Sequence, residues 1–159
     1  MKFSKLAKKS FIPTMVVAAL LGFGLMALMT QAEESRRVDT VSKYDFDKTV
    51  DTLTKTMKSK GLMVVATLDH QNMLSMVGVK MKGSKTIEFG KPDMGKMVLT
   101  MHPEAGLEMP AKVYVFERGD GKTVMSYYKS NYAQYNPEFS KVDEMMGMML
   151  SEIVNEVNK

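Results

Sequence analysis

The sequence predicts an α+β fold, with a single, mostly antiparallel sheet of about five strands and helices packed mainly on one face. Short runs of alternating apolar residues, such as Ile87 and Phe89, indicate half-buried strands. Longer runs with an apolar residue at every third or fourth position, such as Phe46, Val50 and Leu53, indicate amphipathic helices. The predicted order is β-α-β-(α)-β-α-β-β-α, which is typical of one sheet with helices packed over it.

The first part of the predicted domain is a strand, a helix and a second strand. The first strand is expected over residues 36–44, and the helix begins after the N-cap Asp45 and ends before Gly61. Residues 62–68 are apolar almost without a break, which predicts a central strand. A short helix capped by Asp69 is expected next, through Val77 and Gly78.

The segment from Thr86 to Glu117 is expected to form a strand, a turn, a short helix and another strand. It follows a predicted solvated loop over residues 79–85. Gly90 is expected to make a sharp turn with positive φ, and Pro92 suits the first position of the helix because its missing N–H costs nothing there.

The last part of the chain is predicted to be a hairpin followed by a long helix. Gly119-Asp120-Gly121 has the composition of a hairpin turn. The helix is expected to begin at Ser140, with Asp143 placed for a capping box. Its apolar face is expected to pack on the sheet and consists of Val142, Met145, Met146, Met149, Leu150, Ile153, Val154 and Val157.

Residues 1–32 have the pattern of a secretory signal peptide. Four lysines precede an apolar run from Phe11 to Met29, and the small residues of Thr30-Gln31-Ala32 suit a cleavage site. We therefore expect an exported, periplasmic protein whose single domain comprises residues 33–159. The alternative is an inner-membrane anchor formed by residues 11–29, since about 20 apolar residues span a bilayer. Contact with the membrane is then expected only through this segment.

Charge and cysteine content exclude two classes of function. All 18 acidic residues but only 18 of the 22 basic ones follow Ala32, so residues 33–159 have no net formal charge. Nucleic-acid binding is not expected, because it needs a concentrated basic surface. The chain has no cysteine, which rules out disulfides and thiolate metal sites.

Two motifs in the central segment resemble those of a known family. They are FGKPDMG, beginning at Phe89, and LTMHPEAGLEMPAKVYVFE, beginning at Leu99; Lys60-Gly61-Leu62 and Leu68-Asp69-His70 add to the match. Together they resemble the family catalogued as domain of unknown function 302, over residues 38–157. Lys91 replaces the usual Asn of the family motif, and Met109 replaces its usual Leu. The resemblance implies a small α+β domain, often a homodimer, and it implies no known activity.

Methionine is unusually frequent and has two interpretations. Residues 33–159 contain 14 methionines and only seven leucines. Methionine can replace leucine as core filler at nearly constant volume. Thioethers also favour Cu(I), which makes copper the one metal cofactor that we consider. Histidine and methionine occur together only as His70 with Met73 and as Met101 with His102, so these four are the candidate metal ligands.

Three residues are candidates for binding a small ligand. His70 ends a predicted strand, where open sheets tend to place ligands, although it could equally serve as a hydrogen-bonded structural residue. The family resemblance supports a pocket there, and Lys112 matches a basic position in many relatives. Tyr128 belongs to a tyrosine cluster that would form a pocket wall or a dimer contact.

The sequence favours an exported, non-catalytic binding or accessory domain whose ligand it does not identify. The first alternative is a periplasmic Cu(I)-binding protein. The second is a small hydrolase or isomerase with His70 as base. No nucleophile elbow or phosphate loop is present, and the adjacent Asp69 and His70 would point to opposite sides of a strand. We therefore expect no catalytic residues.

Overall fold

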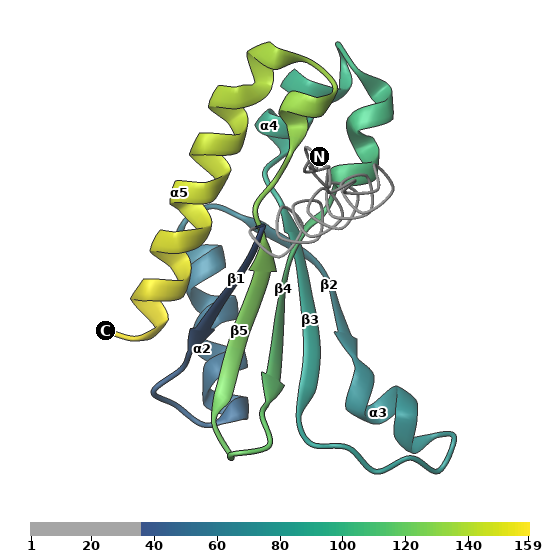
Figure 1. Cartoon of the computed structure of the whole chain (residues 1–159), viewed down its shortest axis with the longest axis vertical. Helices are drawn as coiled ribbons and strands as arrows, with labels where there is room; N and C mark the ends of the chain where they lie inside the picture. The colour runs from purple at the N-terminus through teal and green to yellow at the C-terminus, as the bar shows by residue number, and fades with distance from the viewer. Residues whose placement is uncertain (1–35) are drawn as a thin grey trace, which may run out of the picture. The chain divides into compact units, whose positions relative to one another are not determined.

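The computed structural model describes residues 36–159, which form one sheet with helices packed against it (Figure 1). The strands are β1 (Arg37–Val41), β2 (Met63–Asp69), β3 (Ser84–Gly90), β4 (Ala111–Glu117) and β5 (Thr123–Tyr128). The α-helices are α2 (Phe46–Ser59), α3 (His70–Ser75), α4 (Pro92–Leu99) and α5 (Ser140–Val157). Short 3₁₀ helices are η1 (Pro103–Glu108), η2 (Tyr132–Gln134) and η3 (Pro137–Phe139). The predicted α+β class is confirmed.

The predicted signal peptide, residues 1–32, lies outside the described residues. Between residues 36 and 159, no helix is both long and apolar enough to cross a membrane.

The sheet is antiparallel throughout and has the strand order β1-β5-β4-β3-β2. β2 is therefore an edge strand, and the prediction that residues 62–68 form a central strand is wrong. A continuous apolar run normally means that both faces of a strand are buried. Here Val64 packs against the core, whereas Met63 is 54% exposed and Val65 is 50% exposed. A bulge between Val64 and Ala66 shifts the register of this strand.

The main core lies between the sheet and two helices on the same face, α2 and α5. Ile87 and Phe89 of β3 and Val113 and Val115 of β4 are almost fully buried there. Burying a side chain of this kind stabilises the fold by roughly 1.5–3 kcal/mol. We call the opposite side of the sheet, which points away from α2 and α5, the outer face.

The two ends of the sheet are followed by different elements. At the Gly90 end, where β3 ends and β2 and β4 begin, Gly90 pairs with Met63 and the chain continues into α4. At the Asp69 end, where β2 ends and β3 begins, Asp69 pairs with Lys85 and the chain continues into α3. Figure 1 shows α4 and α3 at these opposite ends.

Both ends of α2 have the predicted caps. The Asp45 side chain accepts a hydrogen bond from the Lys48 N–H at 2.8 Å. At the other end Gly61 adopts φ +74°, and the N–H groups of Gly61 and Leu62 donate to the carbonyls of Lys58 and Met57. This pair of bonds is a Schellman motif, which needs a left-handed residue at its glycine.

Substituting Gly61 tests this cap. Gly61→Ala is expected to lower the free energy of unfolding by about 1 kcal/mol, because an L-residue at this φ is strained even though no atom lies within 4 Å of the new Cβ. The matched control is Gly147→Ala in α5, where the new Cβ also meets no atom within 4 Å. The higher helix propensity of alanine should raise the free energy of unfolding of this variant by about 1 kcal/mol. Urea denaturation measures both changes in the free energy of unfolding. Equal stabilities for the two variants would contradict the left-handed conformation of Gly61 in the cap.

The predicted turn at Gly90 is wrong in its geometry. The described glycines with positive φ are Gly61, Gly78 and Gly121, and Gly90 is not among them. Gly90 is the last residue of β3, and the chain changes direction through extended Lys91 and Pro92, which opens α4. As the lysine at this position suggests, no side chain caps α4 at Lys91.

Two further local predictions need correction. The loop over residues 79–85 is not solvated throughout, because Gly83 and Ser84 are buried. In α5, Asp143 does not form a capping box, and the helix has no side-chain cap. Met146 is buried as expected, but Met145 is 47% exposed and lies off the core stripe.

Candidate functional site

An apolar cavity of about 410 Å³ lies at the Gly90 end of the sheet. Its walls come from the start of β2, the end of β3, one side of α4, the start of β4 and α5. It lies between the main core and a second cluster of buried residues built from α4, η1, η2, η3 and α5. Met63 and Val65 line it, so two of the apolar side chains that β2 leaves exposed border this cavity.

Five methionines give the cavity an adaptable lining, namely Met63, Met94, Met109, Met146 and Met149. An unbranched thioether side chain changes rotamer easily and fills irregular space, so such a wall can adjust to different ligands. Gly95 of α4 leaves room beside them. The nearest atom to a Cβ built at Gly95 is the Met109 Sδ, at 3.9 Å.

The lining has only two polar side chains, Lys91 and Tyr132. Burial raises the pKa of the Tyr132 hydroxyl to about 12, with further contributions from Glu108, Asp143 and Tyr135. The phenol therefore stays neutral at physiological pH. Tyr132 is almost completely buried and supplies mostly ring surface to the cavity wall.

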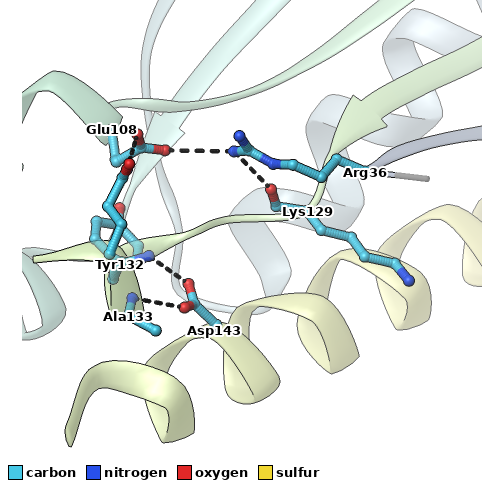
Figure 2. Close-up of polar contacts among 7 residues, drawn as sticks. Arg36, Glu108, Lys129, Tyr132, Ala133 and Asp143 are labelled. Atoms are coloured by element: carbon cyan, nitrogen blue, oxygen red, sulfur yellow. Dashed lines mark hydrogen bonds and ion pairs between the residues drawn. The ribbon is translucent and has the colours of Figure 1, made fainter. Parts of the chain in front are cut away.

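The loop that carries Tyr132 is fastened to α5 and to η1 (Figure 2). The Asp143 carboxylate accepts hydrogen bonds from the N–H groups of Tyr132 and Ala133, at 2.8 and 2.9 Å. On the other side, Glu108 accepts from the Gln134 side-chain amide at 2.8 Å and lies 3.9 Å from the Arg36 guanidinium. This double attachment fixes one wall of the cavity.

His70 lies at the Asp69 end and outside the cavity lining. Its Nε2 is 2.7 Å from the Thr86 hydroxyl on the outer face, and its ring meets Tyr114 edge to face. The Tyr114 hydroxyl is in turn 2.7 Å from the Ser84 hydroxyl. The ring of His70 is thus part of a hydrogen-bonded polar and aromatic cluster on the sheet.

Lys112 and Tyr128 share the outer face with this cluster. Lys112 pairs with Glu88, two residues along β3 from Thr86, and Tyr128 pairs with Arg37 on β1. The structure therefore puts the three predicted ligand-binding residues at the outer face of the sheet, but on three different elements, α3, β4 and β5. None of the described hydrogen bonds joins one of them to another.

The four candidate metal ligands fall into two separate places. His70 and Met73 are at the Asp69 end, while Met101 and His102 follow α4 beyond the Gly90 end. His102 has both ring nitrogens engaged, with Glu104 at 2.9 Å and Asn136 at 3.3 Å. Across residues 36–159, no group of three or more His, Cys, Asp or Glu side chains is arranged to hold a metal ion.

Asp69 does not orient His70 for acid–base chemistry. Its carboxylate accepts a hydrogen bond from the Asn72 N–H at 2.9 Å and lies 3.3 Å from the Lys85 ammonium. The hydrogen bond from Asn72 and the contact with Lys85 hold the pKa of Asp69 below its usual value, although partial burial opposes them. Asp69 therefore acts as the N-cap of α3, as the sequence predicted.

The cavity was not found from the sequence, although its main segment was singled out. Its lining includes Phe89 to Pro92, Met94 and Gly95 from the first motif, and Met109 to Ala111 from the second. These motifs were interpreted as turns and helix boundaries. The available signal was the frequency of methionine in these two motifs and in the last predicted helix, which supply Met94, Met109, Met146 and Met149 to the lining.

Comparison with known proteins identifies the family. The sequence profile of "Domain of unknown function DUF302" matches residues 38–157. The chain belongs to the DUF302 family. A crystal structure of an uncharacterized conserved DUF302 protein from Bacillus stearothermophilus is similar to this DUF302 chain, with a TM-score of 0.70 and 16% identity. The match covers 78% of this chain and 98% of the other, and it bears on the fold alone.

Two curated proteins from Brucella also match part of this DUF302 chain. They are the fluoride-specific ion channels FluC 1 of Brucella suis biovar 1 and FluC 1 of Brucella abortus biovar 1, each 26% identical over 94 residues. The match covers 59% of this chain, but only 37% and 35% of theirs. The chain thus spans little more than a third of these longer relatives.

Proposed function

We propose that the protein is an exported, non-catalytic binding domain whose cavity at the Gly90 end holds a small apolar molecule. The observation that carries the proposal is the cavity itself. Its volume of about 410 Å³ falls in the range of small-molecule sites, which are concave, mostly apolar and provided with few polar groups. Export is supported by the signal-like pattern of residues 1–32.

The polar groups of the cavity suit an apolar ligand with one polar end. Lys91 is exposed at the rim, where its ammonium can meet water or an anionic group. Tyr132 is neutral and can give one hydroxyl hydrogen bond. The remaining lining offers hydrocarbon and thioether surface, which stabilises a ligand through burial rather than through directional contacts.

The Brucella relatives support the accessory part of the proposal. A segment similar to this domain makes up about a third of chains named as fluoride-specific ion channels. We therefore propose that domains of this type serve as binding components beside other functional parts.

Cu(I) is a second candidate ligand, and the five thioethers of the cavity favour it. They are soft donors in a site that lacks water-exposed carboxylates, which is the donor chemistry that Cu(I) prefers. They are also better grouped than the predicted ligands His70, Met73, Met101 and His102, which lie at two ends of the sheet.

Titration with the apolar fluorophore N-phenyl-1-naphthylamine tests the proposal. The protein is expected to bind it saturably, and Gly95→Phe should weaken binding by about tenfold or more, because the new ring enters the cavity beside Met109. The matched control is Gly147→Phe on α5, where the new Cβ meets no atom within 4 Å and the position lies outside the lining of the cavity. Equal binding by both variants would place the probe elsewhere.

A double substitution in the cavity distinguishes an apolar ligand from Cu(I). Met94→Leu with Met109→Leu keeps the cavity apolar but removes two thioethers, so fluorophore binding should persist. If Cu(I) is the ligand, a competition titration against a chelator should show its affinity falling sharply in this variant. His70→Ala with Met73→Leu is the corresponding test of the site at the Asp69 end.

A further inference from the structure

The segment between β2 and β3 presents apolar side chains to solvent at the Asp69 end. We call residues 70–82, which comprise α3 and the loop after it, the α3 tip. Met76 is 79% exposed and Val77 is 73% exposed. Met73, Leu74 and Val79 are exposed as well, and α3 has no buried residue. Figure 1 shows this segment projecting beyond the edge of the sheet.

The charges of the α3 tip have one sign. Lys80 and Lys82 are exposed, and no acidic residue occurs between His70 and Ile87. The nearest carboxylate, Asp69, is already engaged with Lys85 and with the Asn72 N–H. The apolar residues therefore lie beside two lysines that form no ion pair with any of residues 36–159.

A second group of exposed apolar residues at the Gly90 end has neighbours of both charges, including Lys96 of α4. Leu99, Met101 and Leu107 are exposed there, next to Glu104 and Glu108. Exposed apolar area alone does not distinguish a membrane from a protein partner. The basic neighbours of the α3 tip favour an anionic surface and disfavour a second copy of this chain, because two copies meeting tip to tip would bring lysine against lysine.

We propose that the α3 tip docks on an anionic lipid surface, with Met76 and Val77 entering the interface and Lys80 and Lys82 facing the lipid headgroups. Exposed apolar side chains on a projecting segment gain by insertion, and lysines beside them gain from the negative surface potential. Docking in this way leaves the cavity at the far end of the sheet, roughly 20 Å away for strands of this length. The surface consists of residues 70–82 alone, and none of them lines the cavity.

The absence of tryptophan makes the proposal testable in the full chain. Because the sequence contains no Trp, Val77→Trp reports on the α3 tip alone, whatever the N-terminal segment does. Its emission is expected to shift to the blue, and to be quenched by brominated lipid, with phosphatidylglycerol-containing vesicles but not with neutral phosphatidylcholine vesicles. Leu107→Trp, which replaces a side chain that is 88% exposed at the other end, should show neither change.

Removing the two lysines should weaken docking. Lys80→Gln with Lys82→Gln in the Val77→Trp chain is expected to raise the lipid concentration at half-binding by roughly thirtyfold, about fivefold for each lysine. Equal shifts on anionic and neutral vesicles, or none on either, would overturn the proposal. A blue shift that appears without lipid and grows with protein concentration would also overturn it, because a second copy would then cover the tip.

Discussion

Gly83→Ala is expected to lower the free energy of unfolding by about 3 kcal/mol, and the melting temperature by roughly 10 °C. A Cβ built at Gly83 lies 2.5 Å from Cγ of the Phe46 ring and 2.6–2.8 Å from both Cδ atoms. That part of the ring is next to the backbone of α2, so it cannot move away as the end of a flexible side chain could. Two hydrogen bonds also hold Gly83 in place. Its N–H donates to the Glu117 carboxylate at 2.7 Å, and its carbonyl accepts from the Glu117 N–H at 2.9 Å.

A double-mutant cycle isolates the clash. Phe46→Ala destabilises the protein on its own, because Phe46 belongs to the main core, but it should remove most of the cost of Gly83→Ala. Gly119→Ala serves as the matched control, since its Cβ meets no atom within 4 Å. Thermal and urea denaturation of the four cycle members give the coupling energy, and additive losses would mean that the ring of Phe46 is not the obstacle.

Asp143→Ala is expected to cost about 2–3 kcal/mol and to loosen the wall of the cavity. The substitution leaves two partly buried N–H groups, those of Tyr132 and Ala133, without their acceptor. Hydrogen exchange of these two amides should become much faster, while exchange in α2 should change only as far as global stability changes.

Asp143→Asn provides the matched control for this prediction. Its amide oxygen can still accept one of the two hydrogen bonds, so about half of the loss is expected. If exchange of the Tyr132 amide were unaltered in Asp143→Ala, the loop would be held by the contacts of Glu108 with Gln134 and Arg36 instead.

Local signals in the sequence predicted most of the fold. The ends of helices were predicted well, because a helix cap depends on residues that are close in the sequence. The residues that have the expected role are Asp45, Gly61, Asp69 and Pro92. Strand position was predicted wrongly for β2, because an apolar run looks the same whether it faces a covering helix or a cavity.

The candidate site depended on contacts that spacing alone does not show. Asp143 has the right offset for a capping box, but its carboxylate accepts hydrogen bonds from Tyr132 and Ala133, eleven and ten residues earlier in the chain. Met145 and Met149 fit one helical stripe, yet only Met149 reaches the core and the cavity. The cavity arises where α4 and α5 meet the end of the sheet, which requires knowing how distant segments pack.

The position of β1 has a consequence for the order in which the chain can fold. β1 pairs only with β5 within the described sheet, so that Arg37 must meet Tyr128, 91 positions later. Asn158 then holds the end of β1, accepting from the Lys43 N–H and donating to the Val41 carbonyl, both at 3.0 Å. During synthesis, β1 therefore has no partner strand in the described sheet until β5 has been made. Loop closure over this distance is slow compared with helix formation, so the joining of β1 to the sheet should be a late folding event.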